Sequence, residues 1–351
     1  MKLRIGQSLE SQRQLFINYG ERTEINNHAV FYGKSGMGKS YAINLISRQC
    51  VELGYACVIL DYSQSYNLCD DADGKIHVID VDHYQIGAFR VKNINGNREN
   101  PYKYASRVSS ILQKMFKFGE VQKEFAFEVA QRAYEQGKNL TLMKLAKADQ
   151  VREKSEQLKI YRKIINWAKA PCFAENREFI RWKEIISSKG TYIIKFSCTY
   201  SESEKIFLSE LILMDLLAYC EERGPIDNLD DIAARKESFI LCLDEVQRLS
   251  FSKQMPLRRL LTEGRKFGAN IWASTQSVEL CNKDMQILLG QAEVIFEFHP
   301  DDRALLKYKK EKDERRMMLK KLGRGQCMIT ARYVRNDGKV TRKASLYAKI
   351  Q

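Results

Sequence analysis

The feature that most constrains the fold is the run 33–40, which has the sequence G-K-S-G-M-G-K-S. Its spacing, G-x-x-x-x-G-K-[ST], is typical of a loop whose backbone N–H groups wrap a chain of phosphates. An apolar run at 29–32 precedes the loop, and residues 41–46 follow it with helical apolar spacing. A strand, loop and helix in this order place phosphates at a helix N-terminus, where the dipole favours anions. The sequence therefore predicts a nucleotide-binding α/β structure.

Individual residues of this run have separate roles. Lys39 can reach the β- and γ-phosphates of a nucleotide, and the Ser40 hydroxyl can hold Mg²⁺. The residues predicted to contact the nucleotide are Gly33, Lys34, Ser35, Gly36, Met37, Gly38, Lys39, Ser40 and Tyr41. A Gly-rich turn with a surface lysine is the alternative, but the flanking strand and helix favour the phosphate loop. His28, just before the strand, either contacts the nucleotide or makes a local hydrogen bond in its turn.

Composition limits the class of protein. The 351 residues are 44% hydrophobic and carry a net charge of +14, which fits a well-buried core and an acidic partner, with nucleic acid first. A charge that serves solubility alone is the alternative. No apolar run approaches the ~20 residues of a membrane span, and the N-terminus lacks a secretory segment. The nine cysteines form no C-x-x-C pair, which favours a reducing compartment, and we expect a cytoplasmic protein.

The apolar pattern changes along the chain and suggests one domain interrupted by an insertion. Runs at 56–60, 76–79, 191–196 and 293–298 are short and apolar, as expected of strands. Between about 102 and 186, apolar residues recur instead at helical spacing. We therefore predict a nucleotide-binding core formed by residues 1–101 and 187–351, with a helical insertion at 102–186.

A second motif follows about 200 residues later, where an apolar run ends in Asp244 and Glu245. A buried parallel strand at this point would deliver both carboxylates beside the phosphate loop. Asp244 would accept the water shell of Mg²⁺ together with Ser40, and Glu245 would activate or orient the attacking water. A strand that ends in a solvated acidic turn is the alternative.

A third block, 257–277, consists of a helix, a turn at Gly268 and another buried strand that ends in Thr275 and Gln276. An amide at this strand tip can sense the γ-phosphate or hold the attacking water, and an arginine of the preceding helix region can stabilise transition-state charge. A cap-region hydrogen bond for Gln276 and a solvated helix face for Arg258 or Arg259 are the alternatives.

These blocks together resemble the HerA/FtsK superfamily of ATPases. The similar stretches are N-N-H-A-V-F-Y-G-K-S-G-M-G-K-S, I-L-D-Y-S-Q-S-Y, I-L-C-L-D-E-V-Q-R-L and E-G-R-K-F-G-A-N-I-W-A-S-T-Q-S. The resemblance implies a P-loop NTPase fold of the RecA/ASCE type, with a mostly parallel central sheet and helices on both faces. It also implies ATP and Mg²⁺ as cofactors, a hexameric ring with DNA in its pore, Arg265 as an arginine finger acting in trans, and Gln276 as the strand-tip sensor.

The sequence departs from the superfamily pattern at 61–66, which has D-Y-S-Q-S-Y where HerA-like members usually have D-x-H-G-E-Y. The histidine and glutamate are missing, so the pattern does not support a catalytic role for this loop. Asp61 either contacts metal-bound water or caps the next turn. We see no room for the N-terminal β-barrel of the family and no C-terminal winged helix, so we expect a minimal motor that relies on partners, such as a nuclease.

A basic cluster near the end offers a site for nucleic acid. Residues 303–324 contain ten Lys or Arg and three acidic residues. Such density can contact phosphates, although a solvated helical face is the more usual role of a charge run. The predicted contacts are Lys307, Lys309, Lys310, Arg315 and Arg316.

Two functions remain open at this point. The first is an ATP-hydrolysing motor subunit that translocates double-stranded DNA as a ring. The second is an ATP-dependent assembly or signalling module, for example of a defence or conjugation-like complex, that acts on partner proteins. A GTPase is disfavoured, because N-K-D-M at 282–285 misses the N-K-x-D pattern by one position.

Overall fold

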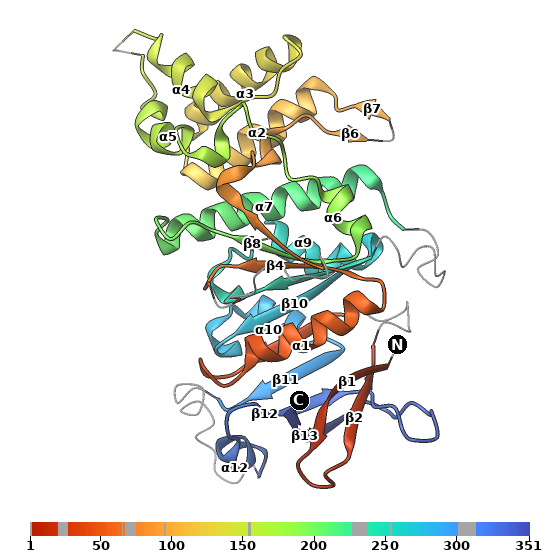
Figure 1. The fold of residues 1–351 in the computed structure, drawn as a ribbon. Helices are drawn as coiled ribbons and strands as arrows, with labels where there is room; N and C mark the ends of the chain where they lie inside the picture. Colours follow the sequence, from red (N-terminus) through yellow and green to blue (C-terminus); the bar gives the residue numbers. More distant parts are fainter. Residues whose placement is uncertain are drawn as a thin grey trace. The chain divides into compact units, whose positions relative to one another are not determined.

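The computed structural model describes most of the chain, and within that part eleven strands form a single large sheet. The described residues are 2–19, 27–64, 66, 75–94, 96–153, 156–226, 238–252, 255–300 and 314–351. The strands of the large sheet lie in the order β2-β1-β13-β12-β11-β3-β10-β9-β4-β8-β5 (Figure 1).

The chain divides into two compact units. The first comprises Met1–Ile79, Lys183–Lys195 and Pro225–Gln351, and it contains the large sheet. The second comprises Asp80–Trp182 and Phe196–Gly224. The domain boundaries expected from the sequence, with an insertion at 102–186, stay a prediction.

The centre of the sheet is parallel. Its strands are β11 (Val294–Phe298), β3 (Ala29–Tyr32), β10 (Ala269–Thr275), β9 (Phe239–Leu243), β4 (Ala56–Asp61) and β8 (Thr191–Lys195), and each pairs in parallel with its neighbour. β4, β9 and β10 are buried along their whole length. Continuous apolar runs are what a strand needs when both faces of a parallel sheet are covered, so the sequence prediction of a parallel core is confirmed.

One edge of the sheet is antiparallel. It consists of β12 (Gln326–Ala331), β13 (Ala344–Ile350), β1 (Lys2–Ser8) and β2 (Gln14–Asn18). β12 and β13 form a hairpin, with Gly338 at a φ of 79° in the connection between them. The sequence did not predict that β1 pairs with β13. That pairing joins the two ends of the chain and extends the sheet beyond the parallel part.

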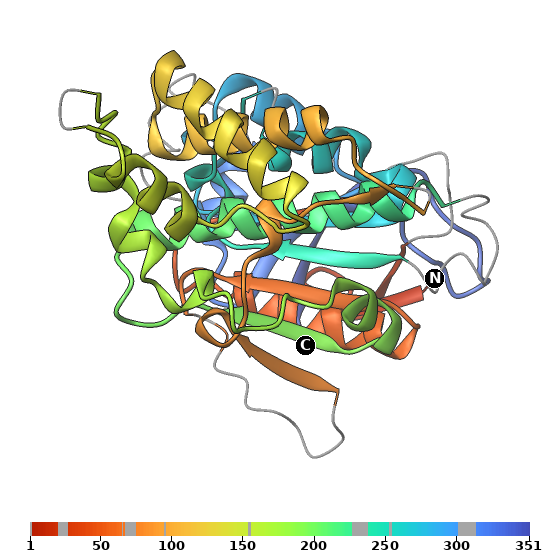
Figure 2. The same cartoon turned by 90° about the horizontal axis from the view of Figure 1, so that it is seen from above.

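Helices of the first unit cover both faces of the sheet. α1 (Lys39–Glu52) connects β3 to β4, whereas α9 (Pro256–Glu263) and α10 (Lys283–Gly290) lie on connections that run across the sheet in the opposite direction. Because such crossovers are right-handed, opposite directions place the helices on opposite faces (Figure 2). β5 (Ile76–Asp80) forms the other edge of the sheet, and α12 (Glu314–Lys321) precedes β12.

Aromatic side chains fill the core between α1 and the sheet. Phe31 stacks on Phe296 with ring centroids 4.5 Å apart, and Trp272 contacts both Phe31 and Tyr19. The Trp272 indole N–H donates to the Tyr19 hydroxyl over 2.8 Å, so this buried polar group is paired. The cluster fixes β3 rigidly between β10 and β11, and β3 carries the phosphate loop.

The second unit is mainly helical. Its helices include α2 (Pro101–Phe116), α3 (Glu120–Glu135), α4 (Leu142–Gln150), α5 (Ile160–Ala168) and α7 (Glu202–Arg223), and α6 (Trp182–Ser188) begins in it. β6 (Asn93–Ile94) and β7 (Asn97–Arg98) form a small antiparallel pair. The carboxylate of Asp215, fully buried on α7, accepts hydrogen bonds from Arg90 Nε at 3.2 Å and Trp182 Nε1 at 2.9 Å.

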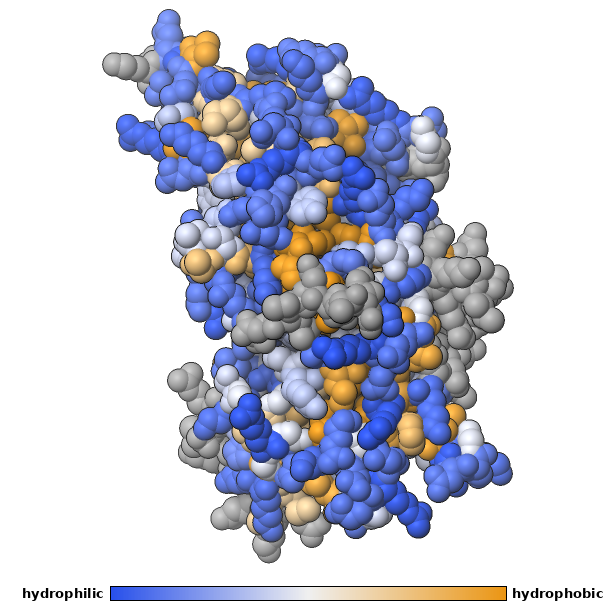
Figure 3. All heavy atoms as spheres, viewed as in Figure 1, coloured by the Kyte–Doolittle hydropathy of each residue, from blue (hydrophilic) through white to orange (hydrophobic). Residues whose placement is uncertain are grey.

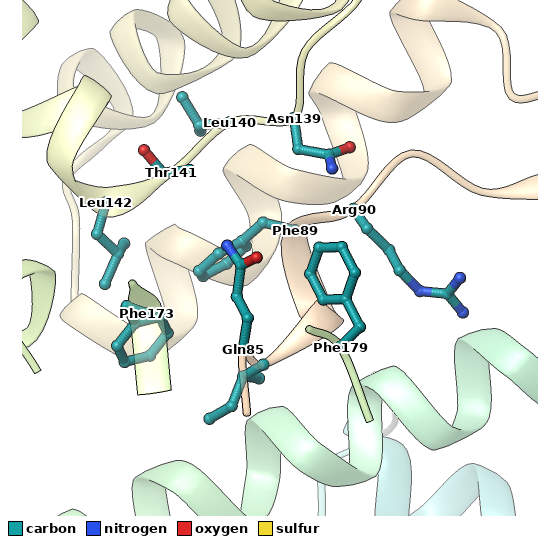
Figure 4. A pocket seen from close by; sticks show the side chains of 10 residues that line it. Gln85, Phe89, Arg90, Asn139, Leu140, Thr141, Leu142, Phe173 and Phe179 are labelled. Carbon is teal, nitrogen blue, oxygen red and sulfur yellow. The ribbon is translucent and has the colours of Figure 1, made fainter. Parts of the chain in front are cut away.

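A pocket in the second unit is lined by Phe89, Phe173 and Phe179 together with several polar side chains (Figure 4). Two of those polar side chains have partners inside the unit. Asn139 accepts from the Val91 N–H at 2.8 Å, and Arg90 also contacts Glu222 at 3.2 Å. Asn139 and Arg90 therefore contribute to the stability of the second unit.

On the face in Figure 3, hydrophilic residues dominate and hydrophobic residues gather in smaller patches. Among the described residues, no helix combines the length and the apolar character of a membrane span. The described cysteines are free thiols, and Cys57 and Cys242 are buried in β4 and β9.

Candidate active site

The register of the parallel strands brings the three sequence motifs together at the carboxyl ends of β3, β9 and β10. Tyr32, the last residue of β3, pairs with Thr275, the last residue of β10. Leu243, the last residue of β9, pairs with Ala273 of β10 and with Leu60 of β4. The loops that follow these strands therefore leave the sheet together, at the carboxyl ends where open α/β sheets bind ligands.

The phosphate loop is braced by the ends of neighbouring strands. The Gly33 N–H donates to the Thr275 carbonyl at 3.3 Å, and the Lys34 N–H donates to the His299 carbonyl at 2.8 Å. Gly33 has a φ of 148°, and a Cβ at this position would lie 2.6 Å from the Phe298 Cβ. Only glycine fits this approach, so the first glycine of the motif is required by packing as well as by backbone conformation.

Lys39 lies at the start of α1 with its ammonium directed back across the loop. The side chain is 7% exposed, and Nζ donates to the carbonyls of Gly33 at 2.7 Å and Lys34 at 3.3 Å. Burial lowers the pKa of Lys39, and the carboxylates of Glu245 and Asp244 partly oppose this shift. A buried positive charge at a helix N-terminus gives the loop a strong preference for an anion.

The remaining predicted loop residues are open to solvent to different degrees. Lys34, Ser35, Gly36 and Tyr41 are exposed. Met37, Gly38 and Ser40 are half-buried. Gly38 has a φ of 110° and is the N-terminal cap of α1, so the chain turns directly from the loop into the helix.

Asp244 follows β9 and offers a carboxylate for a metal ion. It is 9% exposed, its Oδ1 accepts the Glu245 N–H at 3.1 Å, and its Oδ2 accepts a hydrogen bond from the Ser63 hydroxyl. The buried Tyr66 hydroxyl hydrogen-bonds Ser40, and burial together with the nearby Asp244 carboxylate raises the Tyr66 pKa. Ser40 and Asp244 therefore lie near the same phenol. Hydroxyl and carboxylate oxygens are ligands that Mg²⁺ prefers, so these residues fit the predicted ion.

Glu245 is held in a strained backbone conformation. Its φ of 48° is in the left-handed region, which is costly for a residue other than glycine and recurs at active sites. Gln276 Nε2 donates to Glu245 Oε1 at 3.2 Å, and the Gln247 amide donates to Oε2. The predicted catalytic carboxylate is thus bracketed by two amides, and Gln276 contacts it from the tip of β10.

The sequence predicted roles for Glu245 and Gln276 but none for Gln247. Gln276 contacts Glu245, and its role as a strand-tip sensor stays a prediction. Gln247 belongs to a short 3₁₀ helix, Val246–Arg248, that begins directly after Glu245. No spacing rule predicts that this turn brings the amide back to the carboxylate.

A comparison with known families identifies the chain. Residues 11–212, more than half of the 351, match the family described as the central domain of the helicase HerA. The chain belongs to this family. With the phosphate loop, Asp244 and Glu245 at one sheet edge, it is a HerA-type P-loop ATPase.

Solved structures support the same fold for this HerA-type ATPase. VirB4 of Thermoanaerobacter pseudethanolicus matches with a TM-score of 0.69 at 14% identity, covering 99% of this chain and 96% of that one. The bacterial conjugative coupling protein TrwB matches with a TM-score of 0.61 at 13% identity, covering 100% and 94%. A TrwB complex with the ATP analogue ADPNP matches at 0.62, and one with ADP and Mg²⁺ at 0.56. Among curated proteins, none matches significantly.

Arg265 lies away from the nucleotide site of its own chain. It is exposed in the 3₁₀ helix Gly264–Phe267, immediately before β10, whereas Gln276 follows the other end of that strand. β10 has seven residues, each about 3.3 Å long, so Arg265 and Gln276 lie at opposite ends of this strand. Arg258 pairs with Asp284 at 2.7 Å.

His28 and Asp61, which the sequence offered as possible contacts of the nucleotide or of metal-bound water, both make hydrogen bonds within the fold. The His28 ring is buried, with Nδ1 accepting the Ile271 N–H at 3.0 Å and Nε2 lying 3.1 Å from the Leu261 carbonyl. The expectation of a local hydrogen bond is wrong, because both partners are more than 230 residues away. Asp61 Oδ2 accepts the Tyr66 N–H at 3.3 Å, which is the contact expected of a turn cap.

Of the five predicted nucleic-acid contacts, the structure describes the backbone of two and the side chain of none. Lys307, Lys309 and Lys310 lie outside the described residues. Arg315 and Arg316 belong to α12, and their side chains are not described. These five contacts stay predictions.

Proposed function

We propose that this HerA-type ATPase is a motor subunit that uses ATP to move double-stranded DNA through a ring. The observation that carries the proposal is the hydrogen bond between Glu245 and Gln276 beside Lys39 and Asp244. Glu245 follows β9 and is held by an amide at the tip of β10, the neighbouring strand. A glutamate held in this way suits the activation of water for hydrolysis, which nucleotide binding alone does not require.

Each group at this sheet edge has a distinct part in hydrolysis. The loop N–H groups and Lys39 would bind the β- and γ-phosphates, and Ser40 and Asp244 would hold Mg²⁺. When bound, Mg²⁺ would neutralise charge that develops on the phosphates. Glu245 orients the attacking water and draws off its proton, while Gln276 links that carboxylate to the γ-phosphate position.

A ring would give Arg265 a function that its own chain does not offer. Since Arg265 lies at the sheet edge opposite its own nucleotide site, it could stabilise transition-state charge only at the site of a neighbouring subunit. Arg265→Ala and Lys39→Ala should each be inactive as pure proteins. Mixing them would pair a normal Arg265 with a normal Lys39 at some interfaces, so part of the turnover should return.

DNA as the substrate is supported by the family and by charge. The matched family is named for a helicase, TrwB is a conjugative coupling protein, and this chain carries a net charge of +14. The test is ATP hydrolysis at low salt with and without double-stranded DNA. We expect DNA to stimulate hydrolysis, and we expect this stimulation to fade as the salt concentration rises. Binding to DNA phosphates releases counterions, and a higher salt concentration opposes that release.

The same experiment can contradict the motor. Turnover that double-stranded DNA, single-stranded DNA and RNA all leave unchanged would exclude a nucleic-acid motor. That result would favour the assembly or signalling module, and the next step would be a search for protein partners.

A further inference from the structure

The loop after β4 makes contact with both predicted Mg²⁺ ligands. We call residues 61–64 and Tyr66 the β4 loop. Its Ser63 hydroxyl donates to Asp244 Oδ2, and its Tyr66 hydroxyl hydrogen-bonds Ser40. Ser40 lies in α1, which follows β3, and Asp244 follows β9, and β10 lies between these two strands in the sheet. One loop therefore connects two ligands that the sheet itself does not join directly.

The contact with Asp244 fixes the rotation of its carboxylate. Oδ2 accepts from Ser63 while Oδ1 accepts from the Glu245 N–H, so both oxygens have defined directions. A carboxylate held at both oxygens keeps its remaining lone pairs pointed in fixed directions. Such hydrogen bonds to a metal ligand commonly set metal affinity.

The contact with Ser40 acts on the second ligand. Tyr66 is 3% exposed, so its hydroxyl is shielded from water and bonds to a protein group, Ser40, instead. When the Ser40 proton is directed to the phenol oxygen, the lone pairs of Ser40 remain available to a cation.

The β4 loop is itself anchored. Asp61 is fully buried, and its Oδ2 accepts a hydrogen bond from the Tyr66 N–H at 3.3 Å. This bond connects the first residue of the β4 loop to the last. Arg248 donates to the Tyr62 hydroxyl at 3.2 Å, which ties the loop to the turn that follows Glu245. Gln64 adopts a φ of 55°, so the chain turns at this residue, directly after Ser63.

We propose that Ser63 and Tyr66 are positioning residues that hold Asp244 and Ser40 in the geometry that binds Mg²⁺. This inference rests on the proposed nucleotide site but not on the action on DNA. It gives a function to a loop whose sequence lacks the histidine and glutamate that HerA-like members usually have there. In this chain the loop orients the metal ligands through neutral hydroxyl groups.

The test measures the affinity of the full chain for ATPγS as Mg²⁺ is varied, with an EDTA sample that contains no free Mg²⁺. Ser63→Ala and Tyr66→Phe each remove one hydroxyl. Each variant should need about 10-fold more Mg²⁺ than the wild type to reach the same ATPγS affinity. In EDTA both should bind ATPγS as the wild type does, which also shows that they are folded.

Two controls separate positioning from loop structure. Ser63→Thr keeps the hydroxyl and should restore the wild-type Mg²⁺ dependence. Tyr134→Phe makes the same chemical change as Tyr66→Phe in the second unit, where the hydroxyl donates to the Glu99 carbonyl at 2.6 Å. It should leave the Mg²⁺ dependence unchanged.

Two results would overturn the inference. One is a wild-type Mg²⁺ dependence in Ser63→Ala and Tyr66→Phe. The other is a loss of ATPγS affinity that is as large in EDTA as in Mg²⁺. A wild-type chain that binds no ATPγS would contradict the nucleotide site as well. Because the assay contains no DNA, failure of the DNA motor alone would leave this inference standing.

Discussion

Buried charge has opposite purposes in the two units of this protein. At the sheet edge of the first unit, Lys39 is buried with its ammonium on neutral carbonyl oxygens, and burial lowers its pKa. In the second unit, Asp215 is buried against the guanidinium of Arg90 and the indole of Trp182. The first arrangement suits an anionic ligand, whereas the carboxylate in the second has its hydrogen-bond partners within the fold. Substitutions should therefore affect activity at the first site and stability at the second.

The largest expected effect is the loss of turnover in Lys39→Ala. Removing a positive charge aimed at the transferred phosphate should lower ATP hydrolysis by about 10³-fold. Because Lys39 is desolvated, its removal should leave the free energy of unfolding unchanged or raise it. Phosphate release and denaturant unfolding measure the two quantities, and the exposed Lys283→Ala is the control. Wild-type turnover, or a large loss of stability, would contradict the comparison.

Asp215→Ala should show the reverse pattern. It leaves the Arg90 guanidinium and the Trp182 N–H without this acceptor, and breaking a buried ion pair costs about 3–5 kcal/mol. Denaturant unfolding should show this loss, and Asp215→Asn, which keeps an acceptor for Trp182, should lose less. If Asp215→Ala unfolded at the wild-type denaturant concentration, the cluster would not be a stabilising one.

His28 sharpens the comparison, because it is a buried titratable group in the first unit that serves the fold. Burial lowers the pKa of His28 from its ordinary value of 6.5 to about 4. The unfolded chain binds a proton below pH 6.5 and the folded chain does not, so stability is lost as pH falls from 6.5 towards 4. The total is about 3 kcal/mol, at about 1.4 kcal/mol per pH unit.

The measurement is the free energy of unfolding of the wild type and of His28→Gln at several pH values. The variant should be less stable at about pH 7, because it loses the contacts with Ile271 and Leu261. The gap between the two proteins should shrink as the pH is lowered through this window. Parallel curves would show that His28 does not titrate as its burial implies.

The smallest predicted effect is that of Gln247→Ala. Losing one hydrogen bond to Glu245 should lower kcat about 5-fold, which corresponds to about 1 kcal/mol, with the KM for ATP unchanged. Gln286→Ala is a matched control, because its amide donates to the Cys281 carbonyl at 2.7 Å, a contact outside the predicted site. A rise in KM with normal kcat would show that Gln247 acts on ATP binding instead of on Glu245.

Much of the fold follows from the sequence because its signals are local. The strand, loop and helix around Gly33 to Ser40 and the apolar runs of β4 and β9 need only short windows to predict. The edge pairing of β1 with β13 joins residues such as Gly6 and Ile350, and no local pattern specifies such a partner. His28 was misjudged for the same reason, since its partners come from α9 and β10.

The candidate site divides in a similar way. Asp244, Glu245 and Gln276 could be predicted because each follows a recognisable buried strand. Ser63, Tyr66 and Gln247 could not, because their roles depend on where loops fold back in space. The β4 loop is the clearest case: its departures from D-x-H-G-E-Y suggested no role, yet two of its hydroxyl groups contact the predicted metal ligands.

The most direct test of the account is Glu245→Gln. Glutamine keeps the size and polarity of the side chain but cannot take a proton from water. The variant should bind ATP in Mg²⁺ with wild-type affinity and hydrolyse it at least about 10²-fold more slowly, as expected when a general base is lost. Wild-type turnover in this variant would contradict the assignment of the active site to the edge formed by β3, β10, β9 and β4.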